Sequence, residues 1–310
     1  MVGGTRAGDQ LLKSADTTTI VEKQPNRTHP LFAQPMPAAA LPSKTVLPFV
    51  GDHHLYEPTP ARPVRGKRAQ ALAQATHFEP HAHPWAQIAY CASGTLHVSV
   101  QDRHAAHDTS YVVPPSRAVW IAPQSRHTCA VLRAATMHTL YLEPGAMPPG
   151  WDSSRMFAVT PLLRELLLAL EHAEPGPRET HLSALVLLEI QSAATEPLGV
   201  PMPRSDGSDK RLRALCEAVL TAPAERATLA ERARRVGASE RTAARLFKDD
   251  LGTSYPSWRR QVVLAHALPL LALGASVGEV ANACGYASES AFTAMVKAQL
   301  GQPPSAFQGK

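Results

Sequence analysis

The sequence predicts an α+β chain of two domains: an N-terminal all-β barrel with trailing helices, then an all-α domain of two helix-turn-helix units. Three observations predict this. Between residues 65 and 145, short strands with turn residues between them recur at about ten-residue spacing. A helical period follows them. The last hundred residues contain an internal repeat, and a chain of 310 residues is long enough for two domains.

The composition excludes several classes of protein. The chain has 44% hydrophobic and 18% charged residues, which is typical of globular proteins. No apolar run approaches the roughly 20 residues that span a bilayer, and the N-terminus lacks the apolar stretch of a signal peptide. The four cysteines are far apart with no CxxC pair, which indicates reduced thiols rather than a disulfide framework. We therefore expect a cytoplasmic protein.

Residues 1–64 are predicted to form a disordered tail. Many of the 28 prolines of the chain fall in this segment, where they interrupt any helix or strand. No sustained hydrophobic period accompanies them, so the segment offers little apolar surface for a packed core.

Residues 65–145 are predicted to form the barrel. Leu96, Val98 and Val100 alternate with polar residues, as in a half-buried strand. Further short strands are expected at 87–91, 111–113, 119–121 and 139–142, separated by turn residues. Strands of this length at this spacing are typical of an all-β sandwich or barrel.

Residues 146–196 are predicted to be a helical segment that mediates dimerisation. PLLRELLLALEHA and THLSALVLLEIQSAA read as two apolar helices joined by a turn. Leu182, Leu185, Val186 and Ile190 lie along one face of the second helix, with Leu188 beside them. This stripe either packs within the chain or forms a dimer interface. Residues 197–208 have the composition of a linker.

The internal repeat lies in residues 209–310. TLAERARRVG (228–237) aligns with SVGEVANACG (276–285), and ASERTAARLFKDDLG (238–252) aligns with ASESAFTAMVKAQLG (287–301). Each copy reads as a short helix, a glycine-containing turn, a capping serine and a longer helix that ends at glycine. This is the pattern of two helix-turn-helix units.

The repeat is also the basic part of the chain. Residues 210–310 carry 14 lysines and arginines against 8 acidic residues, whereas residues 1–209 are almost neutral. A basic module attached to a neutral domain is typical of nucleic-acid binding. In the helix 239–250 the apolar side chains share one face, and basic side chains share the other, from which arginine can bond guanine. The candidate DNA-binding residues are Arg241, Thr242, Arg245 and Lys248 in the first unit and Ser290, Thr293, Ala294 and Lys297 in the second.

A long helix is predicted between the two units, at residues 254–274. Trp258, Val262, Ala265 and Leu268 form its apolar face. Such a helix would fix the distance between the two units. At about one turn of DNA, roughly 34 Å, both could enter successive segments of the major groove.

Residues 210–308 resemble the DNA-binding domain of the AraC/XylS-type bacterial transcription regulators. The segments that carry the resemblance are LAERARRVGASERTAARLFKDDLGTSYPSWRRQ, SVGEVANACGYASESAFTAM and LGQPPSAF. The N-terminal part resembles the sensor domain of this family, a cupin barrel, and HPWAQIAYCASGTLHVSV is similar to its nitroimidazole-efflux-regulator branch. The resemblance implies a one-component regulator that senses a small molecule, forms a homodimer and acts on double-stranded promoter DNA, with RNA polymerase as a further partner.

Three residues depart from the pattern of this family. Pro269 lies within the linker helix and is expected to kink or shorten it. Val296 stands where the family usually has phenylalanine, and Gln308 stands where the closing motif usually has arginine.

The histidines of the barrel resemble a metal-binding motif. His81, His83, Gln87 and Gly94 resemble the first cupin motif with glutamine in place of glutamate, and His127 stands at the histidine of the second. Three interpretations follow: a metal-dependent cupin enzyme (a dioxygenase or isomerase) with a helical accessory domain, a metal-assisted sensor, or a barrel whose histidines line an organic-ligand pocket or belong to the core.

We expect the third interpretation, because the amide of Gln87 removes one negative charge from a metal site. The sequence therefore predicts no cofactor, no bound metal and no enzymatic activity. His81, His83, Gln87 and His127 are the candidate ligands if a metal binds. The predicted ligand pocket consists of His81, His83, Trp85, Gln87, Trp120, His127 and Tyr141.

Overall fold

The structure is a computed structural model that describes residues 45–47, 53–115, 117–196, 198–204 and 206–308. All of these residues belong to one compact unit, residues 38–310. Of the segment 1–64 that the sequence predicts to be disordered, residues 1–44 and 48–52 lie outside the described residues. The described parts of that segment hold strand β1 (Thr45–Leu47), which pairs parallel with β3 (Thr76–Phe78), and helix α1 (His53–Tyr56).

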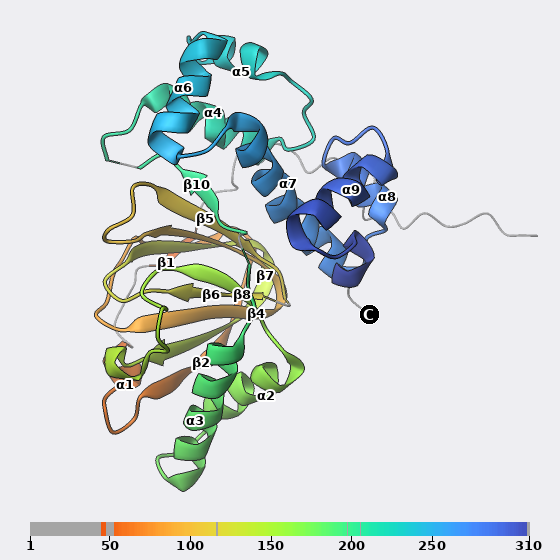
Figure 1. The fold of residues 1–310 in the computed structure, drawn as a ribbon. Coiled ribbons are helices and arrows are strands. Elements are labelled where there is room, and N and C mark those ends of the chain that lie inside the picture. The colour runs from red at the N-terminus through yellow and green to blue at the C-terminus, as the bar shows by residue number, and fades with distance from the viewer. Residues whose placement is uncertain (1–44, 48–52, 116, 197, 205, 309–310) are drawn as a thin grey trace, which may run out of the picture. The chain divides into compact units, whose positions relative to one another are not determined.

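Within the described residues, the N-terminal part forms a ten-stranded sheet built on two long strands. Strand β4 (Ala86–Gln101) pairs antiparallel with β7 (Arg126–Leu142) along most of its length. The first half of β4 also pairs with β6 (Arg117–Ile121) and its second half with β5 (Asp108–Val113). The sheet therefore folds over itself, as Figure 1 shows, and the predicted barrel is confirmed. The remaining strands are β2 (Val64–Leu72), β8 (Arg155–Ala158), β9 (Thr195–Glu196) and β10 (Val200–Met202).

The fold of β4 over the sheet occurs at Gly94. The register between β4 and β7 shifts repeatedly from Cys91 to Leu96, and Gly94 has φ +79° there. A Cβ atom at this position would lie 2.2 Å from the carbonyl oxygen of Ala134. Only glycine therefore allows the two strands to approach each other at this irregularity.

Strand β10 lies within residues 197–208, whose composition is that of a linker. It pairs antiparallel with β5, and its residues Val200 and Met202 are buried while Pro201 between them is half-buried. This short alternation is a strand pattern. It is too brief to stand out among the surrounding prolines and glycines.

The two faces of the sheet contribute to different cores. Ala89 and Cys91 on β4 point to the inner face of the barrel, whereas Ile88 and Tyr90 point to the outer face, because successive side chains of a strand alternate. Helices α2 (Pro161–Leu170) and α3 (Pro177–Ser192), both predicted, cover that outer face. Their buried residues include Leu163, Leu167, Val186 and Ile190.

The C-terminal part is entirely helical apart from its connections (Figure 1). The two predicted helix-turn-helix units are α5 (Leu229–Arg235) with α6 (Glu240–Leu251) and α8 (Val277–Ala283) with α9 (Glu289–Leu300). Helix α4 (Lys210–Thr221) precedes the first unit, and α7 (Tyr255–Ala272) connects the two. Short 3-10 helices lie at η1 (Pro144–Ala146) and η2 (Pro304–Phe307).

Helix α7 belongs to the cores of both units. Trp258 and Val262 pack with α4, α5 and α6, whereas Leu264 and Leu271 pack with α8 and α9. The helix continues past Pro269 to Ala272, so the proline lies near its end and does not cut it short at that residue. Among the described residues, no helix combines the length and apolar character that crossing a membrane requires.

Candidate DNA interface and barrel site

The first helix of each unit begins with the same local structure. Thr228 and Glu231 form a capping box at the start of α5, and Ser276 and Glu279 form one at the start of α8. The glutamate Oε2 accepts a hydrogen bond from the backbone N–H of Thr228 at 2.7 Å and of Ser276 at 2.9 Å. The pKa of Glu231 is lowered by the hydrogen bonds from the backbone and hydroxyl of Thr228, and the pKa of Glu279 is lowered by those from the hydroxyl and backbone of Ser276. The sequence repeat is therefore also a repeat of the interactions that start the helices.

The second helix of each unit begins at the predicted serine and ends at the predicted glycine. Ser239 Oγ accepts from the N–H of Thr242 at 3.1 Å, and Ser288 Oγ accepts from the N–H of Ala291 at 3.2 Å. At the other end, Gly252 and Gly301 have the left-handed conformation. Both caps that the sequence predicts are confirmed.

Helix α6 has a buried face and a basic exposed face. Ala243 and Phe247 are buried in the core of the first unit, as is Leu246. Arg241, Arg245 and Lys248 are exposed on the opposite side, and Thr242 is half-buried beside them. Arg245 forms an ion pair with Asp249 at 3.2 Å. Both partners are largely in water, so the pair is weak and Arg245 can exchange it for another acceptor.

Helix α9 presents a different set of side chains. Phe292 and Val296 are fully buried, so the valine that departs from the family pattern still fills the core. Ser290, Ala294 and Lys297 are exposed, and Thr293 is half-buried. The candidate residues of α9 therefore offer one positive charge and short side chains, where those of α6 offer three charges.

Two further side chains hold the units in place. The guanidinium of Arg232 on α5 is buried, donates to the carbonyl oxygens of Ala227 and Glu225, and pairs with the Glu225 carboxylate at 3.0 Å. The sequence interpretation missed this residue. Its spacing of three from Leu229 and four from Val236 places it on the inner face and could have identified it.

Gln308 donates through Nε2 to the carbonyl oxygen of Ala275 at 3.0 Å, which ties the end of η2 to the start of the second unit.

Three of the predicted pocket residues form a compact cluster in the barrel. His81, His83 and His127 each place one ring nitrogen so that all three lie within 4.8 Å of one another. His81 and His127 are joined by two backbone hydrogen bonds of 3.0 and 2.8 Å. The carbonyl oxygen of His83 accepts from the N–H of Gln124 at 2.8 Å. The backbone therefore fixes the positions from which the three rings converge.

Gln87, Trp85 and Tyr141 surround this cluster. Gln87 Oε1 lies 2.9 Å from His83 Nε2 and 3.2 Å from His127 Nε2. The ring of Trp85 stacks on His83 with centroids 5.2 Å apart, and Tyr141 meets His83 edge-on at 5.6 Å. Burial lowers the pKa of His81 to about 4, lowers that of His83, and raises that of Tyr141. Near neutral pH the imidazoles of His81 and His83 are therefore uncharged.

Trp120 is not part of the cluster, although the sequence places it in the pocket. In the register between β4 and β6, Gln87 pairs with Ile121, and Trp120 pairs with Ile88. Paired residues share a face, so Trp120 points to the outer side of the sheet. There its Nε1–H donates to the carbonyl oxygen of Trp151 at 2.9 Å, and it packs in the core beneath α2 and α3.

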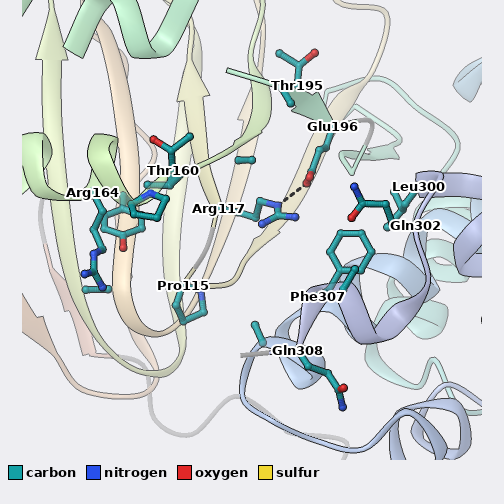
Figure 2. Close-up of a pocket in the computed structure, with 18 of the residues that line it drawn as sticks. Pro115, Arg117, Thr160, Arg164, Thr195, Glu196, Leu300, Gln302, Phe307 and Gln308 are labelled. Atoms are coloured by element: carbon teal, nitrogen blue, oxygen red, sulfur yellow. Dashed lines mark hydrogen bonds and ion pairs between the residues drawn. The ribbon is translucent and has the colours of Figure 1, made fainter. Parts of the chain in front are cut away.

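A separate cavity of about 900 Å³ contains none of the predicted site residues. Figure 2 shows residues from β6, the start of α2, β9 and η2 around it. Arg117 points into the space between them, pairs with Glu196 at 2.6 Å and lies over the ring of Phe307. Arg164 on its rim pairs with Glu165 at 2.8 Å. The residues that line the cavity come from segments far apart in the chain, so no local sequence pattern marks them.

Comparison with known proteins places both parts of the chain in described domain types. Residues 232–310 match the family model of a helix-turn-helix domain, and residues 68–237 match that of an AraC-like ligand binding domain. The chain is 30% identical to the HTH-type transcriptional regulator NimR of Escherichia coli (strain K12) over 233 residues, which is 73% of this chain and 81% of that protein.

Two other comparisons cover different shares of the chain. The HTH-type transcriptional regulator RipA of Corynebacterium glutamicum is 32% identical over 130 residues, 42% of this chain and 37% of that protein. Among solved structures, ToxT from Vibrio cholerae aligns with 79% of this chain and 97% of its own, at 9% sequence identity and a TM-score of 0.33.

Proposed function

Because the chain belongs to the AraC-type helix-turn-helix transcription regulators that carry an AraC-like ligand-binding domain, we propose that α6 and α9 are its two DNA-reading helices. In this proposal each helix enters the major groove of promoter DNA, and α7 sets the distance between them. The exposed basic face of α6 carries the proposal. Arg241, Arg245 and Lys248 lie on that face, opposite the buried Ala243 and Phe247.

In this proposal the two helix-turn-helix units contribute unequally to sequence-specific DNA binding. Arginine can bond guanine O6 and N7 in bidentate fashion, and each such contact discriminates by roughly 1–3 kcal/mol. Serine and threonine have less reach and pair with most bases. The first unit therefore carries most of the sequence specificity. The second unit, through Lys297, adds phosphate anchoring.

The barrel is the sensor in this proposal. A small-molecule effector binds at the cluster of His81, His83, Gln87 and His127, with Trp85 and Tyr141 as apolar walls. The aromatic rings close to a few converging polar atoms support this assignment, because ligand sites combine those features. Trp120 is left out of the proposed pocket because it faces the other side of the sheet.

The protein acts as a homodimer through α2 and α3 in this proposal. Leu162 on α2 and Leu185 and Leu188 on α3 are about half exposed, at 53%, 45% and 59%. Large exposed apolar side chains on both helices of one pair support an interface between two copies. The dimer binds promoters in the cytoplasm beside RNA polymerase, and the chain regulates transcription without catalysing a reaction.

Selection of binding sites from random DNA tests the proposal. Arg241→Ala and Arg245→Ala should relax base preference in one half of the selected site. Ser290→Ala and Thr293→Ala should weaken binding little and almost equally across sequences. Lys297→Ala should reduce the salt dependence of binding by about one unit of slope without altering preference. A sharper consensus under α9 than under α6 would contradict the proposed division.

A further inference from the structure

The basic face of α6 carries an acidic side chain next to one of its candidate base-reading arginines. Asp249 lies one helical turn after Arg245, and its Oδ2 accepts a hydrogen bond from Nη1 of Arg245 at 3.2 Å. Both side chains are exposed, at 66% for Arg245 and 51% for Asp249. The carboxylate therefore lies beside an arginine that the proposed function places against DNA.

Helix stability does not account for this carboxylate. Helix α6 ends at Leu251, so Asp249 lies in its last turn, where the helix dipole disfavours a negative charge. Exposed pairs at this spacing are weak, and they are weaker when the basic residue precedes the acidic one. A negative charge also opposes the attraction of the helix for DNA phosphates. The effect of Asp249 must therefore be sought at Arg245 itself.

The internal repeat provides a comparison for the pair. Arg245 aligns with Ala294 in the second unit. Asp249 aligns with Ala298, so the second unit has neither member of the pair. The lysine that stands between the two positions is present in both units. The acidic residue thus accompanies the arginine, and it does not accompany the lysine.

We propose that Asp249 is a positioning residue that directs Arg245 toward guanine and away from phosphate. This inference rests on the proposed role of α6 in reading DNA. The bond to Asp249 uses Nη1, and the edge formed by Nε and Nη2 can still bond guanine O6 and N7 in bidentate fashion. A guanine edge is uncharged, whereas a phosphate oxygen carries a negative charge that the neighbouring carboxylate repels. The pair also restricts a long side chain that otherwise samples many rotamers.

Asp249→Asn in the full-length chain tests the proposal, because asparagine keeps the size of the side chain and removes its charge. Binding is measured on DNA sites that the wild-type chain selects, on the same sites with single base changes, and on unrelated DNA. At the position where Arg245→Ala loses base preference, we expect Asp249→Asn to reduce the preference by about two- to fivefold, the range that exposed ion pairs contribute. Binding to unrelated DNA should tighten, and the salt dependence of binding should rise by about one unit of slope.

Asp250→Asn is the matched control. It removes the same charge from the neighbouring position of α6, about 100° further round the helix from Asp249. Loss of repulsion alone should tighten its binding to all DNA and leave base preference unchanged. If Asp250→Asn lowers the preference as much as Asp249→Asn does, the effect does not act through Arg245 and the proposal is overturned.

A double-mutant cycle isolates the pair. In the Arg245→Ala background, Asp249→Asn should leave base preference unchanged, because the side chain that it positions is gone. An equal loss of preference with and without Arg245 would contradict the proposal. Unchanged preference in Asp249→Asn alone would overturn only this inference. Unchanged preference in Arg245→Ala would overturn the proposed DNA reading by α6 as well, so the two failures are distinguishable.

Discussion

His138 on β7 donates through Nδ1 to the carboxylate of Glu171, the residue that follows the last residue of α2. The other carboxylate oxygen of Glu171 accepts from the backbone N–H of Ala69 at 3.1 Å. Both side chains of the pair are almost completely buried. The pair therefore fastens α2 to two neighbouring strands of the sheet.

Removal of this carboxylate should destabilise the N-terminal domain strongly. Breaking a buried pair at one partner leaves the other without compensation and typically costs about 3–5 kcal/mol. We expect Glu171→Ala to lower the free energy of unfolding by that amount, measured by urea denaturation. Glu165→Ala, on the same helix but in an exposed pair with Arg164, should change it by less than about 1 kcal/mol. Equal effects of the two variants would contradict this role of Glu171.

The turns of the two helix-turn-helix units should tolerate alanine differently. Gly237 and Gly285 have φ +71° and +76°, so both substitutions meet similar backbone strain. At Gly285, however, an added Cβ would lie 2.4 Å from the carbonyl oxygen of Ala224, whereas nothing lies within 4 Å at Gly237.

We expect Gly237→Ala to cost about 1 kcal/mol, as left-handed backbone does in alanine. Gly285→Ala should cost at least about 1–3 kcal/mol more, because the backbone near Ala224 must move. Thermal unfolding of both variants checks the difference. Equal melting temperatures would mean that the contact at Gly285 relaxes freely.

Acid should destabilise the barrel in part through His97. Burial, together with the nearby His77, lowers the pKa of His97 to about 4. The unfolded chain therefore takes up a proton at His97 as the pH falls below 6.5, while the folded chain does so only near pH 4. Stability falls across this window, by at most roughly 1.4 kcal/mol per pH unit for one group.

His97→Gln should flatten this dependence, and it keeps a partner for Ser110 Oγ. The measurement is the free energy of unfolding at several values between pH 7 and pH 4. His104→Gln changes an exposed histidine and should leave the dependence unchanged. An identical slope in the wild type and in His97→Gln would refute the assignment.

The cysteines should be unreactive in the folded protein. All four are free and buried, and burial raises the pKa of Cys91, Cys129 and Cys284 to about 12 and also raises that of Cys216. Reaction needs the thiolate. A disulfide reagent should therefore label none of them at pH 8 on the timescale of minutes, and all four after denaturation. Rapid labelling of one thiol in the folded chain would locate an opening of its core.

Local patterns predicted the elements that local interactions build. Spacing along the chain is enough to predict several features of the helical units. These are the capping residues Ser239 and Ser288, the glycines after each second helix and the inward face of α6. Strand β2 could not be predicted from the sequence, because most of its residues are polar or small. Its stability comes from pairing with β7, about 70 residues away.

The sequence predicts which residues of the barrel site come together, but not which face of the sheet each side chain occupies, because that depends on the register of the strands. Resemblance to a motif brought His81, His83, Gln87 and His127 together correctly in space. Trp120 was misplaced because one residue of register decides which side of a sheet a side chain faces, and only the pairing of β6 with β4 fixes it. The cavity at Arg117 depends on the packing of distant segments, which the sequence does not encode in any local period.

The sharing of α7 between two cores restricts how the DNA-binding domain can change during evolution. Side chains on the exposed faces of α6 and α9 can be exchanged without disturbing either core. An inserted or deleted residue in the middle of α7 is different, because it turns one half of the helix by about 100° and shifts it by about 1.5 Å against the other. Trp258 and Leu271 could then no longer both face their own partners. The length of this helix is therefore constrained by both cores. If α6 and α9 read DNA as proposed, target preference can change through their exposed side chains, whereas the spacing between them is held constant.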